Sequence, residues 1–214
     1  MDHPRVCVVI DYQNIHLTAR DLFAPAGQPV HESLIHPLRF AEQVIAVRAG
    51  RQRDTTQQQA VLTAVRVFRG SPSNHNDPYA YGISQRQRSE WTRDARVQVV
   101  YRTLRYPPNW PTSPAREKGV DVLVALKVVR AALDPQFDVV ILASHDTDLE
   151  PALEIAVADR QAKIETAGWA GARVLRPSGV RLWHTALSVT DLERTRDRLN
   201  YAPPTRSSKP GHGL

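Results

Sequence analysis

Four aspartates stand where the fold of the chain could bring their carboxylates together. They are Asp11, Asp121, Asp146 and Asp148. Like charges packed a few ångströms apart raise one another's pKa unless a cation compensates them. A hard cation such as Mg²⁺ or Mn²⁺ prefers oxygen ligands, and it can activate water and stabilise the charge that develops during phosphodiester hydrolysis. The four acids therefore point to the chemistry of a metal-dependent nuclease.

Each acid also has an ordinary explanation. Asp121 and Asp148 lie where helices are expected to begin, and capping and the helix dipole favour acids there. Taken singly, capping is the better explanation for both. Asp146 could be an ordinary loop acid, and Asn14 could cap a helix. Asp11 is harder to explain in this way, because apolar residues precede it to the end of a strand.

Strands and helices are expected to alternate along the chain. Short apolar runs predict strands at 5–10, 60–68, 97–101, 138–143, 162–167 and 172–175. The segments between them predict helices at 13–22, 37–49, 83–94, 119–133 and 149–159, with turns at 70–82 and irregular chain at 106–116. This alternation predicts an α/β fold with a mostly parallel central sheet. Because ligands of such sheets bind beyond the carboxyl ends of the strands, Asp11 and Asp146 should lie at one edge.

Three segments resemble the NYN-domain family of the PIN-like nuclease group. They are Ile10-Asp11-Tyr12-Gln13-Asn14 (the family's D-x-x-N opening), Lys118-Gly119-Val120-Asp121-Val122 (its KGVDV element) and Ser144-His145-Asp146-Thr147-Asp148-Leu149-Glu150-Pro151 (its SGDxDFxP element). They occur in the family's order, and the resemblance covers about residues 5–195. It implies a PIN-like three-layer α/β/α fold and an endoribonuclease that uses Mg²⁺ or Mn²⁺.

The resemblance also assigns roles by position. It implies that the four aspartates are catalytic and hold the metal, and that Asn14 steadies the metal site or the phosphate. Lys118 and Ser144 are expected to contact the substrate. His145 departs from the family's pattern, which usually has Gly there. A histidine at this point could narrow the site, bind a phosphate or ligate a softer metal.

The stretch 102–118 carries basic and aromatic residues, namely Arg102, Arg105, Tyr106, Trp110, Arg116 and Lys118, beside the single acid Glu117. Interleaved cations and aromatic rings suit single-stranded nucleic acid. The alternative is a proline-stiffened surface loop whose rings pack on the body of the protein. The stretch leads directly into Asp121, which favours the first interpretation, so Arg102 and Arg105 are expected to bind substrate.

Composition fits this interpretation. With 214 residues, of which 42% are hydrophobic, the chain can bury a core, and we expect one domain at 1–198 and a disordered tail at 199–214. The net charge of +6 favours a polyanion such as nucleic acid, or an anionic membrane, and the resemblance implies RNA as the partner. No apolar run is long enough to span a membrane, and a single Cys7 and no recognisable secretory leader favour the cytoplasm. A homo-oligomer is possible, and a non-catalytic RNA-binding or protein-interaction module is the alternative function.

Overall fold

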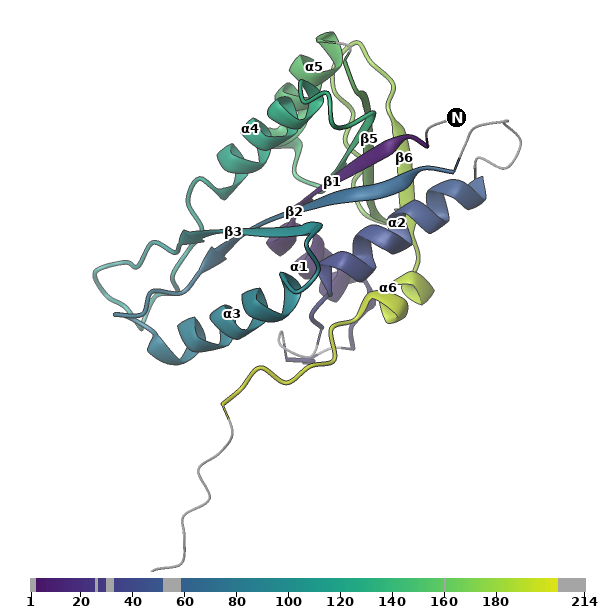
Figure 1. Cartoon of the computed structure of the whole chain (residues 1–214). Coiled ribbons are helices and arrows are strands. Elements are labelled where there is room, and N and C mark those ends of the chain that lie inside the picture. The colour runs from purple at the N-terminus through teal and green to yellow at the C-terminus, as the bar shows by residue number, and fades with distance from the viewer. Residues whose placement is uncertain (1–2, 26, 30–32, 52–58, 160, 204–214) are drawn as a thin grey trace, which may run out of the picture.

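The centre of the molecule is a six-stranded sheet with the order β3-β2-β1-β4-β5-β6 (Figure 1). The computed structural model describes residues 3–25, 27–29, 33–51, 59–159 and 161–203. The strands are β1 (Arg5–Asp11), β2 (Val61–Ser71), β3 (Val97–Thr103), β4 (Val139–Ala143), β5 (Lys163–Trp169) and β6 (Trp183–Leu187). Every pairing among these strands is parallel. The α/β fold predicted from the sequence is confirmed, with a fully parallel sheet.

Helices cover both faces of the sheet. They are α1 (Tyr12–Phe23), α2 (Pro37–Arg51), α3 (Pro78–Trp91), α4 (Val120–Ala132), α5 (Glu150–Ala158) and α6 (Val189–Thr195), with a 3₁₀ turn, η2, at Thr147–Leu149. The core on one face includes buried residues of α1, α2, α3 and α6, and the core on the other face includes those of α4 and α5. The three-layer α/β/α arrangement expected from the sequence is therefore present (Figure 1).

The apolar runs of the central strands follow from this double coverage. Along β1, Val8 and Ile10 pack into one core, whereas Cys7 and Val9 pack into the other. A strand covered on both faces has no polar side, so it reads as a continuous apolar run. Burial raises the pKa of the Cys7 thiol to about 11, as expected for a structural cysteine.

The strand order reverses between β1 and β4. From β1 the chain builds outward through β2 and β3, and it then returns to place β4 on the other side of β1. The helices that leave β1 and β4 therefore diverge to opposite faces and leave a crevice at the carboxyl ends of these two strands. Asp11 is the last residue of β1, and Ser144 directly follows β4.

Two elements differ from the sequence-based prediction. Residues 172–175 form no strand; Leu175 packs into a core instead, and the sixth strand is β6. As an edge strand, β6 buries only alternate residues, so its sequence shows no apolar run. Helix α3 begins at Pro78 instead of residue 83, because the Asp77 side chain accepts a hydrogen bond from the Ala80 amide and proline suits a first helical turn.

Part of the predicted tail is packed. Tyr201 is buried, its hydroxyl donates to Asp197 at 2.7 Å, and its carbonyl accepts a hydrogen bond from Arg86. Asp197 also accepts a hydrogen bond from the indole of Trp91. The segment lacks an apolar pattern, which predicted a disordered tail. These contacts show instead that Tyr201 is held by polar partners. Residues 204–214 lie outside the described residues.

Candidate active site

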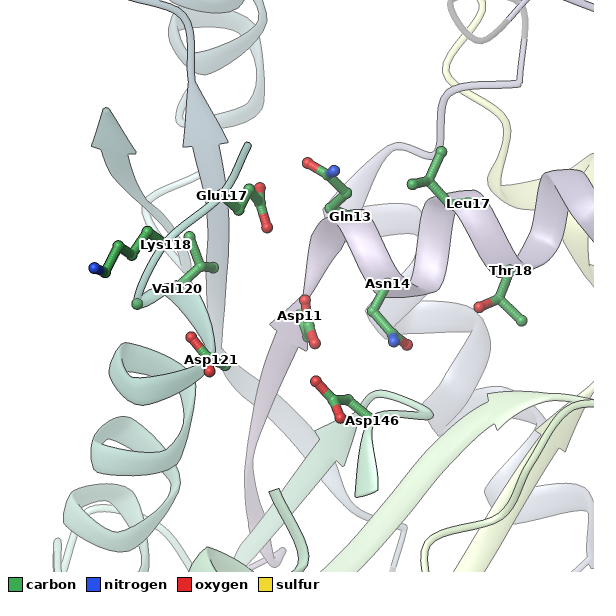
Figure 2. A pocket seen from close by; sticks show the side chains of 11 residues that line it. Asp11, Gln13, Asn14, Leu17, Thr18, Glu117, Lys118, Val120, Asp121 and Asp146 are labelled. Atoms are coloured by element: carbon green, nitrogen blue, oxygen red, sulfur yellow. The ribbon is translucent and has the colours of Figure 1, made fainter. Parts of the chain in front are cut away.

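A cavity of about 530 Å³ lies at the carboxyl edge of the sheet, beside the ends of β1 and β4. Four carboxylates line it, from the end of β1, the segment before α4, the first turn of α4 and the loop after β4 (Figure 2). They are Asp11, Glu117, Asp121 and Asp146. We call this space the acidic cavity. Three of the four predicted aspartates thus line the same cavity, although they are up to 135 residues apart in sequence.

Asp11 is the innermost of these acids. It is 6% exposed, and the Ser144 hydroxyl donates to its Oδ2 at 2.9 Å. The same hydroxyl oxygen accepts a hydrogen bond from the Asp146 amide at 3.1 Å. Ser144 is itself buried and does not line the cavity. Its place is therefore behind the acids, where it fixes Asp11 relative to Asp146, and not in contact with substrate as the sequence suggested.

Burial, with a smaller contribution from neighbouring charges, raises the pKa of two of the four carboxylates. Burial raises the pKa of Asp11 to about 6; the Ser144 hydrogen bond opposes the shift, and the charges of Glu117 and Asp146 add to it. Burial also raises the pKa of Glu117, and the charge of Asp121 adds to that shift. A cation in the cavity would relieve this repulsion.

Glu117 is the site residue that sequence reasoning missed. Its carboxylate accepts a hydrogen bond from the backbone amide of Gly70, near the end of β2, which turns the side chain into the cavity (Figure 2). A side chain on Gly70 would collide with Glu117 and Leu104. From sequence, Glu117 was only the lone acid of a basic stretch, although its place directly before Lys118-Gly119-Val120-Asp121 was an available signal.

Asp121 reaches the cavity from the first turn of α4. The preceding Gly119 has a left-handed backbone with φ of 75°, which glycine adopts without strain. Arg102 lies against Gly119, and its Nε donates to the Lys118 carbonyl. Arg102 therefore braces the chain that leads into α4. Lys118 is exposed and lines the acidic cavity, whereas Arg105 does not.

Asn14 and His145 tie the two strand ends together. The Asn14 side-chain oxygen accepts a hydrogen bond from the His145 amide at 2.8 Å, and Asn14 also lines the cavity. The His145 ring points into the protein: Nδ1 lies 2.7 Å from the Arg173 carbonyl, and Nε2 accepts from the Trp169 amide at 3.1 Å. These partners require the neutral ring with its proton on Nδ1, and burial lowers the pKa of His145 accordingly.

His145 is consequently not placed for a phosphate or a metal. Both ring nitrogens have backbone partners, and the residue is absent from the cavity wall. The ring fits because residue 168 is glycine: a Cβ there would lie 2.2 Å from His145 Cε1. The histidine is a structural brace for the loop after β4, packed in the space that Gly168 leaves.

Asp146 and Asp148 have unequal positions. Asp146 lines the cavity, and its Oδ1 also accepts a hydrogen bond from the Asp148 amide at 3.0 Å, so it caps the turn η2. Asp148 is exposed and does not line the cavity. The capping role that the sequence favoured for Asp148 therefore belongs to Asp146.

The donor chemistry of the acidic cavity fits a hard divalent cation, because carboxylate oxygens are the ligands that Mg²⁺ and Mn²⁺ prefer. Among the described residues, however, no three Asp, Glu, His or Cys side chains are gathered closely enough to hold a metal ion as they stand. The cavity thus has carboxylates of a suitable kind, but their side chains lie too far apart to coordinate one ion in this arrangement.

The segment that carries the acidic cavity also matches a known protein family. The family model described as the NYN domain matches residues 5–176, which contain all four acids of the cavity. The chain belongs to the NYN domain family. This family has a nuclease-like fold, its members are generally nucleases, and NYN and PIN-like nucleases typically use divalent metals.

One solved structure is similar to the chain. The crystal structure of a protein of unknown function from Vibrio parahaemolyticus RIMD 2210633 is similar over 81% of this NYN chain and 87% of its own, with 19% identity and a TM-score of 0.49. No curated protein matches the chain. Over the part that the structure describes, no helix has both the length and the apolar character needed to cross a membrane.

Proposed function

We propose that this NYN protein is a divalent-metal-dependent ribonuclease that hydrolyses internal phosphodiester bonds of RNA at the acidic cavity. The observation that carries the proposal is the convergence of Asp11, Glu117, Asp121 and Asp146 on one cavity at the point where the strand order reverses. Ligands of open parallel sheets bind at such points. Membership of a family of nucleases supports hydrolysis as the chemistry.

The carboxylates of the cavity would hold Mg²⁺ or Mn²⁺, which when bound supplies charge stabilisation and an activated water. Ser144 holds Asp11 in place through its hydroxyl, and Asn14 holds the loop after β4 through the His145 amide. Lys118 is an exposed residue at the wall of the cavity, where its side chain can contact a phosphate of the RNA. These residues orient the site and attract the polyanion.

The test is incubation with mixed RNA in the presence of Mg²⁺, Mn²⁺ or a chelator. We expect cleavage that requires the metal and is lost in Asp146→Asn, whose side chain still accepts the hydrogen bond that caps η2. The matched control is Asp159→Asn, an exposed acid at the far end of α5, which should cleave like the parent. Asp148→Asn should keep more activity than Asp146→Asn, since its carboxylate lies outside the cavity wall.

Two results would overturn the proposal. Equal cleavage by the parent and Asp146→Asn would place the activity elsewhere or in a contaminant. Metal-independent RNA binding with no cleavage under any metal would instead identify the protein as a non-catalytic RNA-binding module.

A further inference from the structure

A second cavity adjoins the acidic one. The chain between β3 and α4 folds back on itself, and Arg105 and Arg116 pair through two backbone hydrogen bonds of 2.8 and 3.0 Å. The hairpin so formed encloses a cavity of about 600 Å³. Glu117 and Lys118 line both this hairpin cavity and the acidic cavity, so the two cavities lie side by side.

Three cationic side chains surround the hairpin cavity, those of Arg105, Arg116 and Lys118. All three residues are exposed, and within the described part of the chain none of these side chains has a hydrogen-bond or ion-pair partner. The acid on the wall, Glu117, is already engaged with the Gly70 amide. The cavity therefore presents unpaired positive charge, which a phosphate would neutralise.

One wall of the hairpin cavity is suited to a base. Tyr106 lines it, together with Pro107, Pro108 and Pro114. The Tyr106 hydroxyl accepts a hydrogen bond from the Ser73 amide at 3.0 Å, and Trp110 packs edge-on against the ring with centroids 4.9 Å apart. Trp110 does not line the cavity itself. Tyr106 is thus held from two sides as a ring on which a base can stack.

The opposite side of the acidic cavity lacks such a feature. There Gln13 and Leu17 are shared with a smaller cavity whose cation is Arg69. The Arg69 guanidinium lies 4.9 Å from the Tyr12 ring centroid and donates to Gln87 at 3.0 Å. The Arg69 guanidinium therefore already has partners within the protein, although its Nε has no hydrogen-bond partner among the described residues. The exposed cations without partners adjoin the acidic cavity on the hairpin side.

We propose that the hairpin cavity is a nucleotide subsite of the acidic centre, in which Arg105, Arg116 and Lys118 hold a backbone phosphate of RNA and Tyr106 stacks on the attached base. This inference rests on the proposed function, since it takes RNA as the substrate. It assigns the neighbouring nucleotide of the substrate to one side of the site. Of the two arginines predicted to bind substrate, Arg105 keeps that role in the subsite, whereas Arg102 braces the chain before α4.

The test measures RNA binding without cleavage. A short fluorescently labelled, unstructured oligoribonucleotide is titrated by anisotropy in chelator, across a salt series. The variant is Arg105→Ala with Arg116→Ala, which spares the backbone pairing of the hairpin. Its control is Arg130→Ala with Arg181→Ala, two exposed arginines with the same change of charge outside both cavities. Melting curves of all proteins confirm folding.

We expect the Arg105/Arg116 variant to bind about tenfold more weakly or worse, because each arginine makes a charge-assisted hydrogen bond. Its log–log salt slope should be smaller by about 1.4, since each lost contact with a single strand removes roughly 0.7. The control pair should bind nearly as the parent does. Equal weakening of both pairs would mean that only net charge matters, and it would overturn the subsite.

Substitutions of Tyr106 test the base contact. Tyr106→Phe keeps the ring and loses only the hydrogen bond to Ser73, so binding should stay near that of the parent. Tyr106→Leu removes the ring and should weaken binding by about 5- to 150-fold with an unchanged salt slope. Parent-like binding by Tyr106→Leu would overturn the stacking.

Failure of the subsite is distinguishable from failure of the proposed function. If the arginine variant binds as the parent does while Asp146→Asn alone abolishes metal-dependent cleavage, the ribonuclease stands and the subsite falls. If the parent binds RNA without cleaving it, and only the hairpin variants lose affinity, the subsite stands and the catalytic proposal falls. Absence of RNA binding by the parent would overturn the subsite.

Discussion

Replacement of Asp11 by Asn should stabilise the metal-free protein at neutral pH. The folded state holds the Asp11 carboxyl at a pKa of about 6, above its ordinary value of 3.8, chiefly through burial. Between these two values the folded protein binds more protons than the unfolded chain, so the stability of the parent falls as the pH rises through this window. Asn carries no charge and does not incur that loss.

The magnitude follows from the shift. At about pH 7.5 the full difference of roughly 2 pKa units corresponds to about 3 kcal/mol of lost stability in the parent, and at about pH 4.5 the same relation gives about 1 kcal/mol. The advantage of Asp11→Asn over the parent should therefore grow by about 2 kcal/mol between these pH values. Asn can still accept the hydrogen bond from Ser144. Its NH₂ group, however, replaces a carboxylate oxygen and needs an acceptor of its own, which reduces the absolute gain in stability at each pH.

The assay is urea denaturation of both proteins in chelator at the two pH values, with the free energy of unfolding taken by linear extrapolation. The pH dependence of the difference isolates the titration of Asp11, because effects on packing are the same at both pH values. Asp159→Asn is the control, because it removes one carboxylate that is exposed and lies outside the acidic cavity.

A difference that does not grow with pH would refute the reasoning. A variant that is less stable than the parent at neutral pH, by an amount independent of pH, would show that the Asp11 side chain serves the fold and that burial of its charge does not lower the stability of the parent.

Three further predictions follow from the same structure. Mg²⁺ or Mn²⁺ should raise the Tm of the parent in calorimetry, since a ligand of the native state stabilises it, and should raise that of Asp146→Asn less; equal rises would exclude Asp146 as a ligand. Gly168→Ala should lower the free energy of unfolding by about 1–3 kcal/mol, because its Cβ would meet the His145 ring, and His145→Ala should restore part of that loss in the double variant. Arg48→Met should lower the free energy of unfolding by about 3–5 kcal/mol in urea denaturation, because Glu165 is wholly buried and, among the described residues, would keep only the exposed Lys163 as an ion-pair partner; adding Glu165→Gln should recover much of this loss.

The central strands were predictable from the sequence. β1 and β4 are buried on both faces, and a short apolar run bounded by polar residues is typical of such strands. Because parallel strands end at the same edge of a sheet, the sequence also predicted Asp11 and Asp146 at one edge. The edge strand β6 could not be found in this way, since only two of its five residues are buried and its sequence has no apolar run.

Helix boundaries were predictable where a cap was clear and the periodicity long. The start of α3 was missed because a turn-rich composition hid the cap that Asp77 provides. The role of Tyr201 was missed because its partners, Asp197 and Arg86, belong to a segment with no apolar pattern and to a helix 115 residues away.

The residues of the acidic cavity were also predictable only in part. The sequence by itself determined which carboxylates follow strands or open helices, because those positions depend on local burial and on the parallel direction of the strands. Only the tertiary structure decided which side chains face the cavity. Glu117 enters it through the Gly70 amide, 47 residues away, and His145 leaves it through Arg173 and Trp169. The direction of a side chain is set by partners from other elements, and no periodicity along the chain records where those partners lie.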